Sequence, residues 1–276
     1  GPMTRSVADA AALLTAMAGR DDADPATATM PGQAVYDYTA RLKDGGLRGA
    51  RIGVLTGPLN QQPGVAPAMQ HALAVLRDAR AVVVPVQLPT QDQWQAAEQV
   101  VLRYEFKAGL ARYLSSHQAP LKDLDAIIAY NRNHADKELV LFAQDLMEAA
   151  AQAGALGAPD YIAARTEAKR LAGPEGIDAV LKADRLDALV APTTGAAWPL
   201  RSGEADAFPG GSYGAAAVAG YPSISVPMAH VNGLPLGLLF MGTAWSEPRL
   251  IELAYDYEQR TRARKPPTFK TEALIR

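Results

Sequence analysis

The sequence contains no cysteine, and this absence removes a set of chemistries. The chain has no disulfide, no thiolate metal ligand and no cysteine nucleophile. Long apolar runs are also absent, and a membrane-spanning helix needs about 20 such residues. The chain also has no large excess of positive or negative charge, because its 27 Lys and Arg nearly balance its 29 Asp and Glu. Nucleic-acid binding needs a basic stripe, and the one basic cluster, RTRARKPP at 260–267, is interpreted as a solvated helix end. Neither a membrane nor a nucleic acid is therefore expected as a partner.

Histidine is scarce as well, and the few that occur form no metal-binding pattern. The four histidines belong to no HxH or HExxH motif, so each is interpreted as a structural or surface residue: His71, His117, His134 and His230. The GxSxG elbow, the GxGxxG loop and the Walker loop are all missing. The sequence therefore predicts neither a metal nor a cofactor. A Ser-His-Asp arrangement stays open, since triads assemble across a fold.

The residues that are present predict a mixed α/β fold. A short apolar strand at 47–55, a helix at 67–80 and a second strand at 81–89 form a βαβ unit, which implies a parallel pair with a right-handed crossover. Pro85 lies inside the second strand, which favours an edge position or a bend. Near the start, Ser6 and Asp9 resemble a capping box at the head of a helix.

The rest of the chain continues this pattern around one long helical stretch. Residues 92–172 are helical in pattern, with breaks near SSHQAP and AGALGAP. Further strands are expected at 186–194, at the end of 211–228 and at 234–242, and Asn-Gly in AHVNG predicts a hairpin between the last two. A closing helix is expected at 246–263, with Pro248 in its first turn. We expect one mixed α/β domain over 1–276 with a helical insertion at about 92–172.

The small-residue segment FPGGSYGAAAVAGYP, at 208–222, permits two interpretations. In one, Gly210 and Gly211 form a turn and Ser212 caps the following helix. In the other, the turn presents a nucleophile, or binds an anion at the helix N-terminus. The capping interpretation is the simpler one. These residues indicate no more than an α/β domain with a pocket.

Several blocks, in order along the whole chain, resemble the C-terminal part of amidase signature family enzymes. They are GPMTRSVADAAALLTAMAGRDDADP, LRGARIGVL, LDALVAPTTG, AAAVAGYPSISVPM, GLPLGLLFMG and EPRLIELAYDYEQRTR. The resemblance implies the amidase signature fold, with a largely parallel mixed sheet flanked by helices. It also implies a serine amidohydrolase that releases ammonia through a seryl acyl-enzyme, with no cofactor.

The resemblance locates the family's catalytic groups outside this chain. The family uses a Ser nucleophile, a second Ser in a cis peptide and a Lys, all in a signature region that precedes the block starting GPM. No such Gly-Ser-rich loop occurs here, so no residue of this chain is assigned as catalytic. The chain alone is expected to be inactive, with the N-terminal part of the same fold as its partner. The sequence does not indicate the cellular compartment of the protein.

The resemblance implies that this chain supplies walls of the substrate pocket. The loops after LVAPTT and around FPGGSY lie where family members line the cavity, and aromatic walls with a few polar groups suit peptide recognition. The candidate substrate-binding residues are Phe208, Tyr213, Ser212, Thr193, Thr194, Trp198, Tyr104 and Glu105.

Other stretches of the chain indicate the substrate class within the family. AGRDDADPATATMPG, AVYDYTARL, YEFKAGL, RLAGPEGID and LLFMGTAWSEP resemble the bacterial peptide amidase branch, which removes the amide from C-terminally amidated peptides. One alternative is the glutaminase subunit of an amidotransferase. That branch carries an acidic residue where this chain has Pro209, Gly210 and Gly211, which favours a peptide amide. A second alternative is a non-catalytic domain or fragment.

Overall fold

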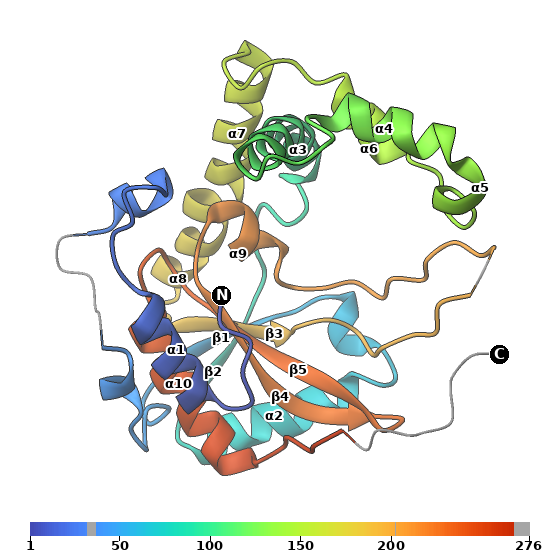
Figure 1. Cartoon of the computed structure of the whole chain (residues 1–276). Coiled ribbons are helices and arrows are strands. Elements are labelled where there is room, and N and C mark those ends of the chain that lie inside the picture. Colours follow the sequence, from blue (N-terminus) through green and yellow to red (C-terminus); the bar gives the residue numbers. More distant parts are fainter. Residues whose placement is uncertain (32–36, 202, 268–276) are drawn as a thin grey trace.

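A five-stranded sheet organises the molecule (Figure 1). The computed structural model describes residues 1–31, 37–201 and 203–267, so part of the AVYDYTARL stretch lies outside the described residues. The strand order is β2-β1-β3-β5-β4. The strands are β1 Arg51–Leu55, β2 Val82–Val86, β3 Ala188–Pro192, β4 Ser223–Val231 and β5 Leu234–Met241.

The strand directions confirm the mixed, largely parallel sheet. Strand β1 lies parallel to both β2 and β3, as the βαβ unit predicts. Strand β5 runs antiparallel to β3 and β4, so it alone opposes the direction of the others. Pro85 lies in β2 at one edge of the sheet, where a missing N–H is tolerated. Strand β4 forms the opposite edge of the sheet within the described part of the chain.

Helices cover both faces of the sheet and build the insertion above it. They are α1 Val7–Met17, α2 Ala66–Asp78, α3 Gln95–Ser116, α4 Leu124–Asn133, α5 Ala135–Glu138, α6 Asp145–Ala151, α7 Pro159–Ala172, α8 Asp178–Ala183, α9 Gly214–Ala219 and α10 Glu247–Thr261. Short 3-10 helices occur at Pro25–Thr29, Thr39–Arg41 and Pro58–Gln61, and a π-helical turn joins α7 to α8 at Gly173–Ile177. The Ser6 half of the predicted capping box is confirmed, since Ser6 Oγ accepts a hydrogen bond from the Asp9 N–H at 3.1 Å.

The alternation of apolar residues along the central strands produces a core on each face. In β3, Val190 joins the cluster that packs against α1, α2 and α10. Its neighbour Leu189 joins the cluster with α8, α9 and the end of α7 on the other face. In β5, Phe240 belongs to the first of these clusters and Met241 to the second. A sheet buried on both faces accounts for strands that are apolar throughout.

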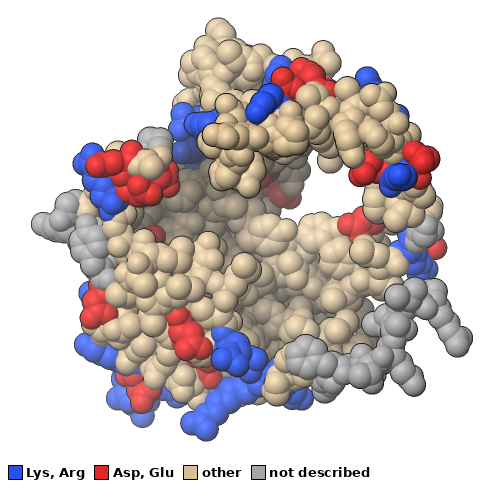
Figure 2. Space-filling view, in the orientation of Figure 1, with Lys and Arg blue, Asp and Glu red and all other residues tan. Residues whose placement is uncertain are grey.

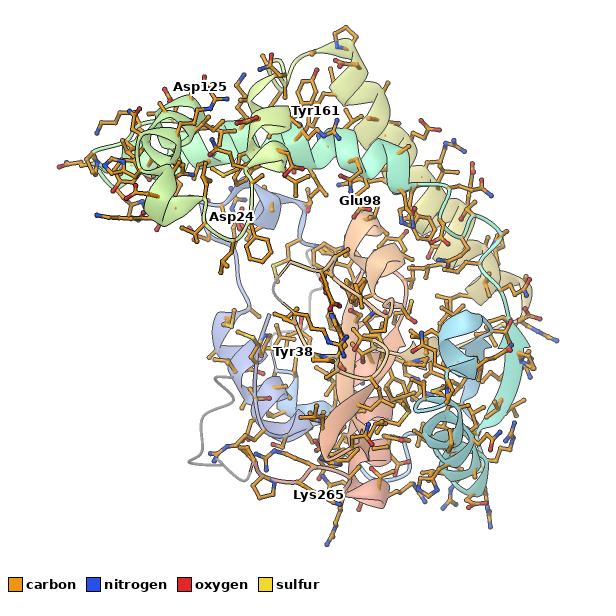
Figure 3. The ribbon with its side chains drawn as sticks, turned by 90° about the vertical axis from the view of Figure 1, so that its right-hand side faces the viewer. Asp24, Tyr38, Glu98, Asp125, Tyr161 and Lys265 are labelled. Carbon is orange, nitrogen blue, oxygen red and sulfur yellow. The ribbon has the colours of Figure 1, made fainter. Side chains whose placement is uncertain are left out.

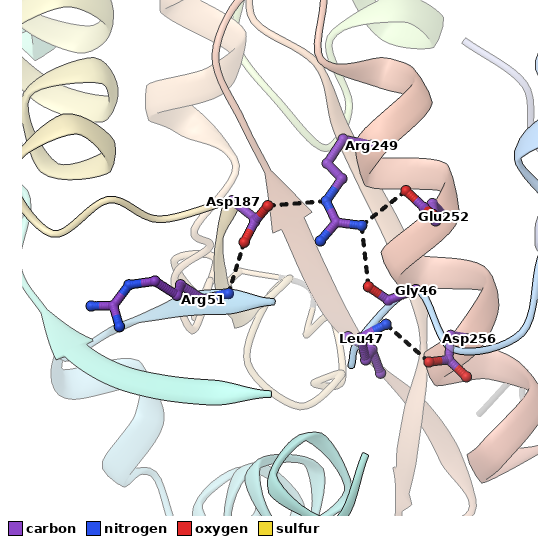
Figure 4. Close-up of polar contacts among 7 residues, drawn as sticks. All are labelled: Gly46, Leu47, Arg51, Asp187, Arg249, Glu252 and Asp256. Atoms are coloured by element: carbon purple, nitrogen blue, oxygen red, sulfur yellow. Dashed lines mark hydrogen bonds and ion pairs between the residues drawn. The ribbon is translucent and has the colours of Figure 1, made fainter. Parts of the chain in front are cut away.

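Polar contacts, one of them at a fully buried carboxylate, attach α10 to the amino ends of β1 and β3 (Figure 4). Asp256 on α10 is 2% exposed and accepts a hydrogen bond from the Leu47 N–H at 3.0 Å. Asp187 accepts from the Arg51 N–H at 2.8 Å, and its other oxygen pairs with Arg249 of α10 at 3.1 Å. These contacts join segments that are far apart in the sequence. They stabilise the end of the sheet opposite the loops described below.

The helical insertion projects from the carboxyl ends of the parallel strands as an arm (Figure 1). Helix α3 packs on α7 through small side chains, with Ala97, Ala164 and Ala168 buried between them. The outer end is held by Leu124 and Ile128 against Ala150. Figure 2 shows an opening between this outer end and the body of the molecule. The helical stretch predicted at 92–172 is confirmed, with further breaks around α5.

Candidate functional site

A cavity of about 650 Å³ lies at the carboxyl ends of β1 and β2. Binding sites of open α/β sheets favour this position, because the loops that leave parallel strands converge there. Three segments form its wall: the loop after β1, the loop from β2 into α3, and residues 208–215. The lining side chains include Leu55, Leu59, Leu88, Trp94, Phe208 and Ser212.

A short two-stranded ribbon forms one side of the cavity. The Gly195 N–H donates to Gly210 O at 3.1 Å, and the Ser212 N–H donates to Thr193 O at 3.0 Å. Gln62 donates from Nε2 to Pro209 O at 2.8 Å, which connects the ribbon to the loop after β1. The loop after β3 and the predicted 208–213 segment are thereby held together.

Glycine at 195 is required by this close packing. A Cβ there would lie 2.6 Å from Pro209 Cβ and 2.7 Å from Gln62 Oε1. Contacts below 3 Å force a neighbour to shift, and here one neighbour is a rigid proline ring. A side chain at Gly195 would therefore displace the ribbon.

Phe208 and Ser212 line this cavity, and their contact with substrate stays a prediction. The Phe208 ring lies 5.5 Å from that of Trp198, whose Nε1 donates to Asp206 at 2.6 Å. The ring of Tyr213 covers Gly211, where a Cβ would lie 2.5 Å from Tyr213 Cε1. The predicted capping role of Ser212 is wrong. Tyr213 is the N-cap residue of α9, and no side chain caps that helix.

Thr193 and Thr194 lie where β3 ends, on the ribbon. Thr194 forms the bridge to Gly211 through its backbone. The hydroxyl oxygens of Thr193 and Ser225 are 2.6 Å apart. They meet above Gly237 of the strand between them. The hydroxyl pair thus connects the ribbon to β4, and neither Thr193 nor Thr194 is among the residues that line the 650 Å³ cavity.

Tyr104 and Glu105 lie on α3 and contact α7. The Tyr104 hydroxyl donates to Asp160 Oδ2 at 2.5 Å, and Tyr161 donates to Glu105 Oε1 at 2.7 Å. The hydrogen bond with Asp160 raises the pKa of Tyr104. Both side chains thus have partners within the insertion, and neither lines the 650 Å³ cavity. Their substrate contact stays a prediction.

Sequence reasoning missed a group of polar residues on the cavity wall. Five carboxamide side chains line it: Asn60, Gln62, Gln87, Gln91 and Gln95. Two carboxylates, Asp92 and Glu98, complete the set. No sequence motif identifies these residues, because only the tertiary structure brings them together on one wall. The available signal was that they lie near the carboxyl ends of the two predicted parallel strands.

We searched the described residues for the serine–histidine arrangement that the sequence left open. Among them Ser116 is the serine hydrogen-bonded to a histidine, with Oγ 3.0 Å from His117 Nδ1. That Nδ1 also lies 2.9 Å from Tyr113 O, and a carbonyl oxygen only accepts. Nδ1 therefore carries the proton and is no base for Ser116. No group of three or more His, Cys, Asp or Glu in the described ranges is placed to hold a metal ion. No helix in the same ranges is long and apolar enough to cross a membrane.

Comparison with known proteins decides the family. The family model described as Amidase matches residues 1–251. The chain belongs to the amidase family. It is similar to the crystal structure of native peptide amidase from Stenotrophomonas maltophilia, with 64% identity and a TM-score of 0.93. That match covers 98% of this chain and 55% of the other.

More distant family members agree with this assignment. A probable amidase of Arabidopsis thaliana is 30% identical over 98% of this chain and 49% of its own length. One subunit of the glutamyl-tRNA(Gln) amidotransferase of Roseobacter denitrificans is 32% identical over 94% of this chain and 54% of its own length. The chain thus spans about half the length of these amidase relatives. The sequence resemblance to the amidase family is confirmed.

Proposed function

We propose that this chain supplies the substrate-binding part of an amidase that hydrolyses the C-terminal amide of peptides and releases ammonia. The similarity to peptide amidase carries the proposal, with 64% identity over 98% of the chain. The cavity supports it. Apolar and aromatic side chains with a few polar groups are typical of small-molecule sites, and 650 Å³ is within their usual range. The carboxamides on the wall both donate and accept hydrogen bonds, which suits a peptide backbone.

The ribbon supports a peptide amide over glutamine. Free glutamine carries an α-ammonium and an α-carboxylate close to its reacting amide. The family's glutaminases hold the ammonium with an acid, and this chain has Gly210 and Gly211 at those positions. Gly210 has a φ of 96°, a left-handed conformation that an aspartate adopts only with strain. The ribbon therefore favours a substrate that has no charged group close to its reacting amide.

The catalytic groups are proposed to lie on a part of the protein outside this sequence. In that proposal, a serine attacks the amide carbonyl, ammonia leaves, and water frees the peptide acid from the acyl-enzyme. The chain's own residues would bind and orient the peptide. The chain spans only about half the length of its relatives, which supports the proposal that the catalytic groups lie elsewhere in the protein. The open edge of the sheet supports it too, because a second and larger cavity of about 990 Å³ runs along β4 and the segment before α1. Exposed edge strands are rare unless they are paired or covered.

Ammonia release by the full-length protein tests the proposed function. A panel of C-terminally amidated tripeptides is compared with free glutamine at equal concentration, and the matching peptide acids serve as blanks. We expect ammonia and peptide acid in equal amounts from the tripeptide amides and little ammonia from glutamine. A preference for glutamine would favour the glutaminase alternative. No ammonia from any of these would favour a non-catalytic role.

A further inference from the structure

The cavity wall carries negative charge. Among the residues that the structure describes, its lining includes Asp92 and Glu98 but no lysine, arginine or histidine. Asp92 accepts hydrogen bonds from the neutral amides of Gln91 and Gln95, at 2.6 and 3.1 Å. Both amides donate to the same oxygen, Oδ1, and because they are neutral they leave the negative charge of Asp92 in place. A concave, partly apolar wall with charge of one sign concentrates the field inside the cavity.

Glu98 differs from Asp92 in its surroundings. It lies in the first turn of α3 and is half-buried, between that helix and α9 (Figure 3). Its carboxylate has no hydrogen bond or ion pair with any residue that the structure describes. Burial raises the pKa of Glu98, which means that its charged form lacks compensation from its surroundings. By contrast, Glu105 two turns along the same helix is paired with Tyr161.

We propose that Glu98 binds an ammonium group of the substrate and so makes this amidase prefer peptide amides that carry one within reach of the cavity. This inference rests on the proposed function. A peptide supplies an ammonium from two sources, the N-terminal α-amine or a lysine side chain. Either would restore to Glu98 the counter-charge that the described lining lacks, while Phe208 and Leu59 provide apolar surface for the rest of the peptide.

Turnover by the full-length protein tests the role of Glu98. The substrates are tripeptide amides in matched pairs, with the N-terminus free or acetylated, and with lysine or acetyl-lysine. The wild-type protein should show a kcat/KM about fivefold higher for the ammonium form, which is about 1 kcal/mol. In Glu98→Gln the ratio should fall to about one, mainly through KM. Glu167→Gln on the exposed face of α7 removes the same charge and should keep the wild-type ratio.

The two acetylated series separate the sources of the ammonium. A loss confined to N-terminal acetylation identifies the α-amine, and a loss confined to acetyl-lysine identifies the side chain. An unchanged ratio in Glu98→Gln would overturn the proposal while leaving the amidase function intact. So would a wild-type protein indifferent to both acetylations.

A binding measurement keeps the proposal testable without turnover. The peptide acids, free and acetylated, are titrated into the same full-length proteins by calorimetry. The free amines should bind the wild-type protein about fivefold more tightly than Glu98→Gln, and the gap should narrow with added salt. Equal affinity in both proteins would contradict a contact between Glu98 and the ammonium.

Discussion

Replacing Gly237 with alanine tests the close packing beneath the candidate site. Gly237 lies in β5, and the hydroxyls of Thr193 and Ser225 meet above it. An added Cβ would lie 2.6 Å from Ser225 Oγ and 2.7 Å from Thr193 Oγ1. The methyl must separate the two hydroxyls. Overpacking costs about 1–3 kcal/mol and a lost hydrogen bond about 1 kcal/mol. Alanine in place of glycine returns about 0.5–1 kcal/mol in a strand, so the net loss should be about 1–3 kcal/mol.

Urea unfolding of the full-length protein measures this loss. The midpoint should fall in Gly237→Ala while the slope stays constant. Adding Ser225→Ala removes one of the clashing oxygens and should recover about 1 kcal/mol. Gly109→Ala is the matched control, because a Cβ at this position in α3 meets nothing within 4 Å. It should stabilise by about 0.5–1 kcal/mol. If Gly237→Ala proved as stable as the wild type, the hydroxyl pair would not occupy the space above β5.

Two further substitutions test how acidic side chains of α10 affect the stability of the fold. Asp256→Ala should cost about 2–3 kcal/mol, because it leaves the buried Leu47 N–H without its acceptor and breaks the pair with Arg260; a urea midpoint equal to that of the wild type would refute it. Burial raises the pKa of Glu247, so the folded state binds this proton more tightly than the unfolded chain does. The charged carboxylate then costs stability above its folded pKa, and Glu247→Gln should be more stable than the wild type at pH 7. The advantage should disappear below about pH 4, where the unfolded glutamate is also protonated; thermal unfolding at both pH values checks the sign.

The elements were predictable where a local pattern determines them. Asn232 and Gly233 join β4 to β5 with φ of 51° and 81°, the left-handed pair that a tight hairpin requires. Pro85 favoured an edge position or a bend, and β2 lies at an edge of the sheet. The order of the strands was not predictable in the same way. Strand β5 lies between β3 and β4, and that placement depends on which faces pack against α10 and α9.

The candidate site was predictable only in part. Phe208 and Ser212 followed from a family block and line the cavity. Glu98 belongs to a helical stretch in which one acid looks like any other. Its proposed role depends on the lack of a cation among the described residues that line the cavity, and that follows from the tertiary arrangement of three separate segments. The Ser212 cap failed because the helix begins one residue later, at a position without a capping side chain.

The Michaelis constant for peptide amides in Phe208→Ala and Tyr213→Ala tests the central claim most directly. The claim is that this chain forms the substrate wall of an amidase. Ammonia release by the full-length protein is followed across several tripeptide amides. The account predicts a higher KM in both variants with a smaller change in kcat, because in the proposed function both aromatic side chains contact the substrate and take no part in the chemistry. A KM unchanged in both variants for all the peptides would contradict it.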